Sequence, residues 1–191
     1  TEGWCAIFAA LRDNKENKIE SWDVSDQGIN TEIAKVLAEY VSVSGVLKTL
    51  DVRCNEISGD AAQLLATAVL ASPSLELFGS VPLKDLRENT LDQLDLSRKS
   101  LGVPEALVLA KLVEGSGVLT SLNLSDNALC GVKFGRGSYD ASGIQALAEA
   151  LKVNGVLTTL NLRGNGFGDE GAKALASALR VNAVLNTLYL G

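Results

Sequence analysis

The sequence predicts an α/β solenoid, in which short parallel strands line a concave face and helices cover the convex side. Three observations lead to this fold class. An eleven-residue motif with apolar residues at fixed positions recurs along the chain, and a stretch with apolar residues at helical spacing follows it. The motif also returns at a nearly constant interval, which is typical of a repeat architecture.

The motif reads apolar, two variable, apolar, one variable, apolar, two variable, and then usually Asn, one variable and apolar. Its best copies are residues 119–129 (LTSLNLSDNAL) and 157–167 (LTTLNLRGNGF). Alternating apolar and variable residues indicate a half-buried strand, and the Asn indicates a turn. Copies start near residues 19, 47, 75, 91, 119, 157 and 185, at intervals of 28, 28, 16, 28, 38 and 28 residues. We therefore expect residues 1–191 to form one repeat domain.

The segment after the motif has the spacing of an amphipathic helix. Apolar residues recur every three or four positions in residues 171–179, and residues 61–70 and 143–151 repeat the scheme. Each unit is thus a strand, a turn and a helix that runs back antiparallel to the strand. Paired strands lie about 4.8 Å apart, whereas packed helices need about 8–10 Å. The stack must therefore curve into a horseshoe with the strands inside.

The 28-residue period and the LxxLxLxxN core, seen best in residues 119–127 and 157–165, resemble the ribonuclease-inhibitor type of leucine-rich repeat. This type also occurs in Ran GTPase-activating proteins and in the sensor regions of NOD-like receptors. The resemblance covers essentially the whole chain and implies a right-handed αβ horseshoe that binds proteins on its concave sheet. It is specific for fold and much less so for function. Ribonuclease inhibitors are very rich in cysteine, so the inhibitor activity itself is not expected of a chain with three cysteines.

The two ends of the repeat array differ. Trp4 and Phe8 are expected to cover the N-terminal end face, as capping units do; the alternative is that they pack against further repeats or a partner. The last strand, which begins near residue 185, leaves an open sheet edge. We expect the natural chain to continue beyond this strand. Otherwise we expect a monomer, or weak self-association through the open strand edge.

Residues 75–90 form a short, irregular unit with no room for a full helix. We expect a short strand followed by a tight turn, with Pro82 helping to end the strand. This unit either relaxes the curvature locally or acts as a hinge. The Asn position of the motif is expected to bond the backbone of the turn, but Leu83 and Lys99 stand there in two units and depart from the pattern.

Composition excludes several classes of function. There is no histidine, which removes imidazole-activated nucleophiles and Cys–His zinc sites, so we expect no enzyme activity, no metal and no cofactor. The net charge of −6 argues against nucleic acid as a partner. Cys5, Cys54 and Cys130 are widely spaced and odd in number, which indicates free thiols in a reducing, cytoplasmic compartment. No apolar run approaches the roughly 20 residues that span a membrane.

Candidate binding residues come first from the variable strand positions that face the concave side. An acidic groove toward the N-terminal half would steer a basic partner. The alternative is a merely solvated face, because Asp and Asn are common at these positions; a hydrolytic or metal site is not expected. The candidates are Asp23, Asp51, Arg53, Asp95, Arg98, Asn123, Arg163 and Tyr189.

A second candidate is an insertion at residues 130–139 (CGVKFGRGSY), which lengthens the fifth unit by ten residues. Its side chains Lys133, Phe134, Arg136 and Tyr139 make it basic and aromatic within an acidic chain. Insertions at one place in a repeat lie on one face, often the binding face. The alternative is a loop that folds over its own helices. Its GRGS segment lacks the spacing of a phosphate-binding loop.

The leading interpretation is a non-catalytic scaffold that binds another protein, with no role in nucleic-acid or membrane binding. One alternative is GTPase activation of the Ran type, for which Arg53, Arg98 and Arg163 are the available arginines in or beside the groove. Another is the ligand-sensing repeat region of a larger NOD-like receptor. Neither alternative has a local motif that distinguishes it.

Overall fold

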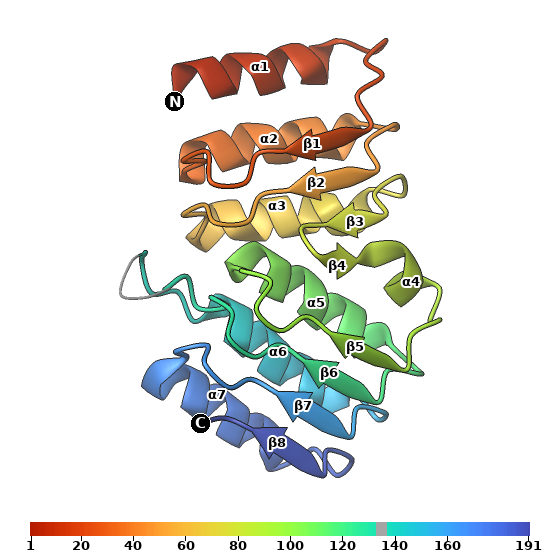
Figure 1. Ribbon diagram of the computed structural model, residues 1–191, viewed down its shortest axis with the longest axis vertical. Coiled ribbons are helices and arrows are strands. Elements are labelled where there is room, and N and C mark those ends of the chain that lie inside the picture. Colours follow the sequence, from red (N-terminus) through yellow and green to blue (C-terminus); the bar gives the residue numbers. More distant parts are fainter. Residues whose placement is uncertain (133–136) are drawn as a thin grey trace.

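The computed structural model describes residues 1–132 and 137–191, and these fold as a two-layered stack of strand–turn–helix units. The units follow one another along the longest axis, with the two ends of the chain at opposite ends of the stack (Figure 1). Helices form one layer and short strands the other. The predicted α/β solenoid is confirmed.

The helices are α1 (Glu2–Asp13), α2 (Thr31–Val43), α3 (Gly59–Ala71), α4 (Leu83–Arg87), α5 (Val103–Gly115), α6 (Ser142–Val153) and α7 (Gly168–Leu179). The strands are β1 (Ser21–Asp23), β2 (Thr49–Asp51), β3 (Leu77–Phe78), β4 (Val81–Pro82), β5 (Gln93–Asp95), β6 (Ser121–Asn123), β7 (Thr159–Asn161) and β8 (Thr187–Tyr189).

The core lies between the two layers. The central residue of most strands points inward; Leu50, Leu122 and Leu160 are each 1% exposed. They meet buried helical residues such as Leu37 and Leu65. Full burial of such a side chain contributes about 1.5–3 kcal/mol. The flanking strand residues point outward, so the repeat spacing itself assigns polar side chains to the concave face.

The helix layer is continuous, because α1, α2, α3, α5, α6 and α7 each pack on the next. Two neighbours approach closely at Gly143, where a Cβ atom would lie 2.7 Å from the Cβ of Ala106 and 2.6 Å from the Leu129 carbonyl oxygen. Glycine is therefore required at this helix position by sterics.

The sheet layer, in contrast, is divided into two four-stranded sheets, β1-β2-β3-β4 and β5-β6-β7-β8. Strand β3 is only two residues long and turns back through Gly79, at a φ of 58°, into β4, which pairs with it antiparallel. A short strand and a tight turn were predicted here, but the division of the sheet was not. This unit has only 16 residues between motif starts, compared with 28 in its neighbours, and β4 with the short helix α4 takes the place of a full-length helix. We call the junction between β4 and β5 the seam.

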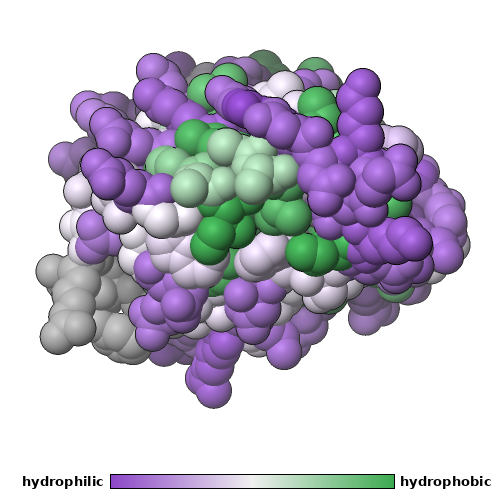
Figure 2. Space-filling view, turned by 90° about the horizontal axis from the view of Figure 1, so that it is seen from above, coloured by the Kyte–Doolittle hydropathy of each residue, from purple (hydrophilic) through white to green (hydrophobic). Residues whose placement is uncertain are grey.

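The expectation that Phe8 lies on the end face is wrong. Phe8 is fully buried, and its ring lies 5.7 Å from that of Trp22 and 6.5 Å from that of Tyr40, so it faces the next unit rather than the end face. Trp4 stacks on Phe8 at 5.7 Å. Trp4 is half-buried, and the uncharged residues Gly3, Ala6, Ile7 and Ala10 of α1 are exposed. Figure 2 looks onto this end of the molecule, where apolar residues gather between hydrophilic borders.

Candidate functional site

The structure brings the predicted concave column to the carboxyl ends of the strands. Within each sheet the register places neighbours side by side, for example Asp23 opposite Asp51 and Asp95 opposite Asn123. The seam separates the two groups. The residues that end their strands are Asp23, Asp51, Asp95, Asn123, Asn161 and Tyr189.

These Asp and Asn residues also have a structural role that the sequence interpretation missed. The side-chain Oδ1 of Asp23 accepts a hydrogen bond from the backbone N–H two residues further on, at 3.0 Å. Asp95 does the same at 2.8 Å, and Asn123 and Asn161 both do so at 3.1 Å. Such bonds are typical of Asx turns and lead the chain out of the strand. A local signal existed, since Asp or Asn stands at this position in five of the seven units.

Two of the carboxylates remain exposed and ionised. The pKa of Asp23 is lowered by hydrogen bonds from the Ser25 hydroxyl and backbone. The pKa of Asp95 is lowered by hydrogen bonds from the backbone and side chain of Ser97. Both side chains therefore keep their negative charge throughout the physiological pH range.

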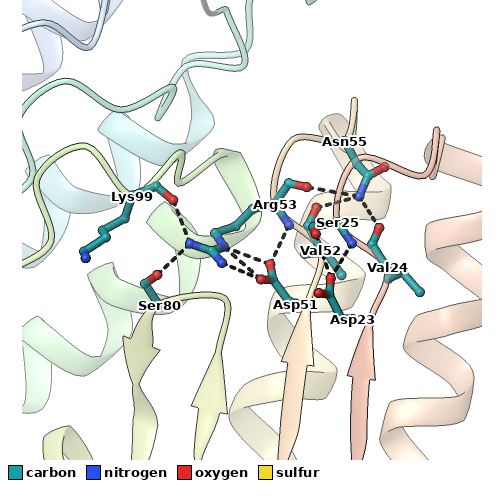
Figure 3. A network of polar contacts seen from close by, with 9 residues as sticks. All are labelled: Asp23, Val24, Ser25, Asp51, Val52, Arg53, Asn55, Ser80 and Lys99. Carbon is teal, nitrogen blue, oxygen red and sulfur yellow. Dashed lines mark hydrogen bonds and ion pairs between the residues drawn. The ribbon is translucent and has the colours of Figure 1, made fainter.

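Arg53 is the centre of a polar network at the seam (Figure 3). Its Nε donates to Asp51 Oδ1 at 2.9 Å, and its Nη2 donates to Asp51 Oδ2 at 2.5 Å. Its Nη1 donates to Ser80 Oγ at 2.7 Å and to the Lys99 carbonyl oxygen at 3.0 Å. Arg53 thus links the unit of β2 to the loop after β5, across the seam. Because its donors are engaged, Arg53 is less available to a partner than its place in the sequence indicates.

The predicted structural role of the motif asparagines is confirmed. Asn55 Nδ2 donates to the carbonyl oxygens of Val24 and Val52 at 2.8 Å, and so joins its own unit to the preceding one. Asn127 and Asn165 repeat this bridge. At the irregular unit the bridge is missing, because Leu83 is buried in the core. Lys99, at the same motif position of the next unit, is exposed.

A second set of bridges joins the opposite ends of the units and was also missed. Asn154 Nδ2 donates to the Val113 carbonyl oxygen at 2.7 Å, and Asn182 Nδ2 donates to that of Leu151 at 2.6 Å. The signal was present as the repeated segments VNGVL and VNAVL, 28 residues apart. These bonds hold the loop that leads from each helix into the next strand.

Glu105 lies beneath the seam and is 1% exposed. Its Oε2 accepts a hydrogen bond from the Gly102 N–H at 2.9 Å, while Oε1 has no hydrogen-bond partner within residues 1–132 and 137–191. Burial raises the pKa of Glu105 to about 7. A Cβ atom on Gly79 would lie 3.2 Å from the Arg53 side chain and 3.3 Å from Glu105 Oε1, so glycine also fits this crowded point.

The other two candidate arginines differ in their contacts. Arg98 donates from Nε to Asp126 Oδ2 at 3.2 Å, although 82% of its side chain is exposed. Arg163 is exposed, and no ion pair of its guanidinium occurs in the described part of the chain. Arg163 is therefore the most available of the three arginines near the concave face.

The described ends of the 130–139 insertion are anchored to three units. The Asp140 N–H donates to the Cys130 carbonyl oxygen at 3.0 Å, and Asp140 Oδ2 accepts from the Gly59 N–H at 2.7 Å. The Tyr139 hydroxyl donates to the Phe167 carbonyl oxygen at 2.6 Å. The candidates Lys133, Phe134 and Arg136 lie outside the described residues. The described ends of the insertion are therefore hydrogen-bonded to the repeat units.

The substitution Tyr139→Phe should lower the free energy of unfolding by about 1 kcal/mol, because it removes one hydrogen bond to a backbone carbonyl. Urea denaturation measures the change. Tyr189→Phe is the matched control, since Tyr189 is 54% exposed on the concave face. Equal losses in the two variants would contradict the anchoring role of Tyr139.

Two further properties bear on function. Within the described ranges no group of three or more Asp, Glu or Cys side chains is placed to hold a metal ion. No helix there is long and apolar enough to cross a membrane.

Comparison with known proteins gives a family match for part of the chain. A family model described as "Leucine Rich repeat" matches residues 46–66 and 153–176. No curated protein matches the chain. Among solved structures, "Leiomodin-1 Actin-Binding Site 2 (ABS2)" is similar at 17% identity and a TM-score of 0.37, covering 96% of this chain and 76% of that one. The tropomodulin C-terminal domain of Caenorhabditis elegans is similar at 15% identity and a TM-score of 0.42, covering 94% and 92%. At these low values neither likeness carries an inference about function.

Proposed function

Because the chain is a leucine-rich-repeat protein, we propose that it is a non-catalytic scaffold that binds a basic surface of another protein on its concave face. The fold presents outward side chains from the strands of two successive sheets on its concave side. Ribonuclease-inhibitor-like repeats and a cytoplasmic setting belong to the same proposal. The three cysteines are free thiols, which suits a reducing compartment.

The observation that supports this most is the pair of exposed carboxylates Asp23 and Asp95, one in each sheet. Their lowered pKa values keep them charged, and the chain as a whole has a net charge of −6. A negative surface of this kind accelerates the approach of a positively charged partner. Asn123, Arg163 and Tyr189 extend the same face toward the C-terminal end and supply hydrogen bonds and an aromatic contact.

Preorganisation favours binding by this face. The Asx-type bonds hold Asp23 and Asp95 in one orientation before a partner arrives, so less side-chain freedom is lost on association. The insertion at residues 130–139 is proposed as a second contact, because its ends are anchored and its sequence carries the basic and aromatic types enriched in binding hot spots.

The double substitution Asp23→Asn with Asp95→Asn tests the proposal. Asparagine keeps the oxygen that accepts the backbone hydrogen bond, as Asn123 and Asn161 show, and removes only the charge. Each exposed charge pair is worth roughly 0.2–1 kcal/mol, so we expect the affinity for a basic partner to fall about fivefold. The steepness of its salt dependence should fall as well.

Immobilised wild-type and variant chains would be compared for proteins retained from native cell extract at two salt concentrations. The matched control, Glu32→Gln with Glu170→Gln, removes two exposed charges from helices instead. A third bait, with residues 131–138 deleted, reports on the insertion. Equal retention of the same partners by the concave variant and the helix control would contradict the acidic concave site. Retention by the deletion bait would remove the insertion from the proposal.

A further inference from the structure

A cavity of about 560 Å³ opens on the loop rim next to the seam. It lies between the loop that joins β2 to α3 and the loop that joins β5 to α5. The loop after β1 and the described base of the 130–139 insertion close its sides. Its lining includes Asp26, Cys54, Glu56, Ile57, Val103 and Gly131. We call this space the seam cavity.

The seam cavity follows from the irregular third unit. Helices α3 and α5 pack directly on each other, but their strands β2 and β5 are separated by β3 and β4. The loop from β2 to α3 and the loop from β5 to α5 therefore begin at separated strands and end at neighbouring helices. Elsewhere a motif asparagine ties neighbouring loops together, but at this junction its place is taken by the exposed Lys99. The Arg53 bridge joins the two units on the concave side, and in the described part of the chain the cavity lies on the rim side.

The chemistry of the cavity is apolar inside and acidic at its mouth. Ile57 and Val103 are 4% and 1% exposed and belong to the core, so they offer an aliphatic wall. Asp26 and Glu56 are both exposed, and neither carboxylate forms an ion pair within the described ranges. Among the lining residues that the structure describes there is no lysine or arginine. An anionic ligand is disfavoured by this charge.

We propose that the seam cavity receives the side chain of a lysine or arginine from a segment of a protein partner. The aliphatic stem of such a side chain packs on an apolar wall while its charged end stays at a polar edge. Asp26 and Glu56 meet that charge at the mouth. The volume lies within the roughly 300–1,000 Å³ typical of ligand sites, so residues flanking the cation fit as well. The inference rests on the proposed function in one respect, that the cation comes from a protein.

The first test uses Nα-acetyl-lysine N-methylamide, whose side-chain amine stays charged, as the probe. Two-dimensional amide NMR of the full chain is the readout. We expect concentration-dependent shifts of the amide signals of Gly102, Ala128 and Gly131, which line the cavity. N-acetyl-norleucine methylamide, which has a similar aliphatic stem without the charge, should bind at least fivefold more weakly. Absent shifts, or equal binding of both probes, would overturn the proposal.

Variants separate the cavity from the concave face. Asp26→Asn with Glu56→Gln should weaken binding of the lysine probe about fivefold, whereas the control Asp169→Asn with Glu170→Gln on α7 should leave it unchanged. Both pairs are exposed, so the amide spectrum is expected to show an intact fold for each. The concave variant of Asp23 and Asp95 should bind the probe like wild type. Binding of the lysine probe to the seam cavity is thereby tested separately from binding of a partner to the concave face.

Cys54 gives a second readout inside the cavity. It is exposed, while Cys130 is buried and its pKa is raised to about 12 by burial, so Cys130 does not react at neutral pH. With Cys5→Ser as the background, a fluorescent maleimide should label Cys54 alone. Saturating lysine probe should slow this labelling at least threefold, and the norleucine probe should not. Unchanged labelling at a concentration that saturates the NMR shifts would place the probe elsewhere and overturn the assignment.

Discussion

Replacing Asn127 with alanine should lower the free energy of unfolding by about 3–5 kcal/mol. Asn127 is 3% exposed, and its Nδ2 donates to the carbonyl oxygens of Leu96 and Leu124 at 2.8 and 2.9 Å. Its Oδ1 accepts from the backbone N–H groups of Lys99 and Leu101 at 3.0 and 3.1 Å. Asn165 still donates to the Leu124 carbonyl oxygen, so alanine leaves the other three groups without a partner, and each buried group left unpaired costs about 1–3 kcal/mol.

Urea denaturation of wild type and variant measures this loss. The matched control is Asn161→Ala, because Asn161 lies half-buried at the end of β7 and caps its turn with one bond to the Arg163 N–H. The control should cost about 1 kcal/mol. Similar losses in both variants would show that the bridge between units does not contribute the stability assigned to it.

The buried Glu105 should make the protein less stable as the pH rises from about 4.5 to 7. Burial raises its pKa from 4.5 to about 7, so the folded chain holds a proton in this range that the unfolded chain has released. Stability then falls with pH, by an amount on the order of 3 kcal/mol, and this group adds no further change above its folded pKa. The nearby Asp51 raises the pKa of Glu105, while Arg53 lowers it.

Comparison with Glu105→Gln isolates the effect. Glutamine keeps an oxygen that accepts the Gly102 N–H and does not titrate. Unfolding free energies of both chains would be measured by urea denaturation at several values between about pH 4.5 and 8. The wild type should lose stability relative to the variant as pH rises across this window. Parallel curves would mean that Glu105 is ionised in the folded protein at low pH.

The repeat spacing was sufficient to predict the layers of the fold, because each aliphatic position of the motif must be buried to form a core. Leu50, Leu122 and Leu160 occupy equivalent positions and are equally buried. Spacing does not say which neighbouring unit a helical side chain faces. Phe8 was therefore assigned to the end face, although it packs on Trp22 and Tyr40.

The candidate site was predicted less completely. The spacing indicated that Asp23, Asp51 and Asp95 face outward, and the structure brings them to strand ends. It did not indicate that Arg53 also donates to Ser80 and to the Lys99 carbonyl oxygen, because those contacts depend on the seam. The seam cavity was also beyond prediction, because it arises from the relative positions of β2, β5 and their helices rather than from any local pattern.

Site-specific photo-crosslinking tests the central claim most directly, that the concave face binds a protein. A photoreactive phenylalanine analogue would replace Gln93, which is exposed on β5, or Lys111, which is exposed on α5 of the same unit. We predict crosslinks to a partner from position 93 that are reduced several-fold when Asp23 and Asp95 are changed to asparagine, and none from position 111. Crosslinks from position 111 alone would place the partner on the helices and contradict the concave site.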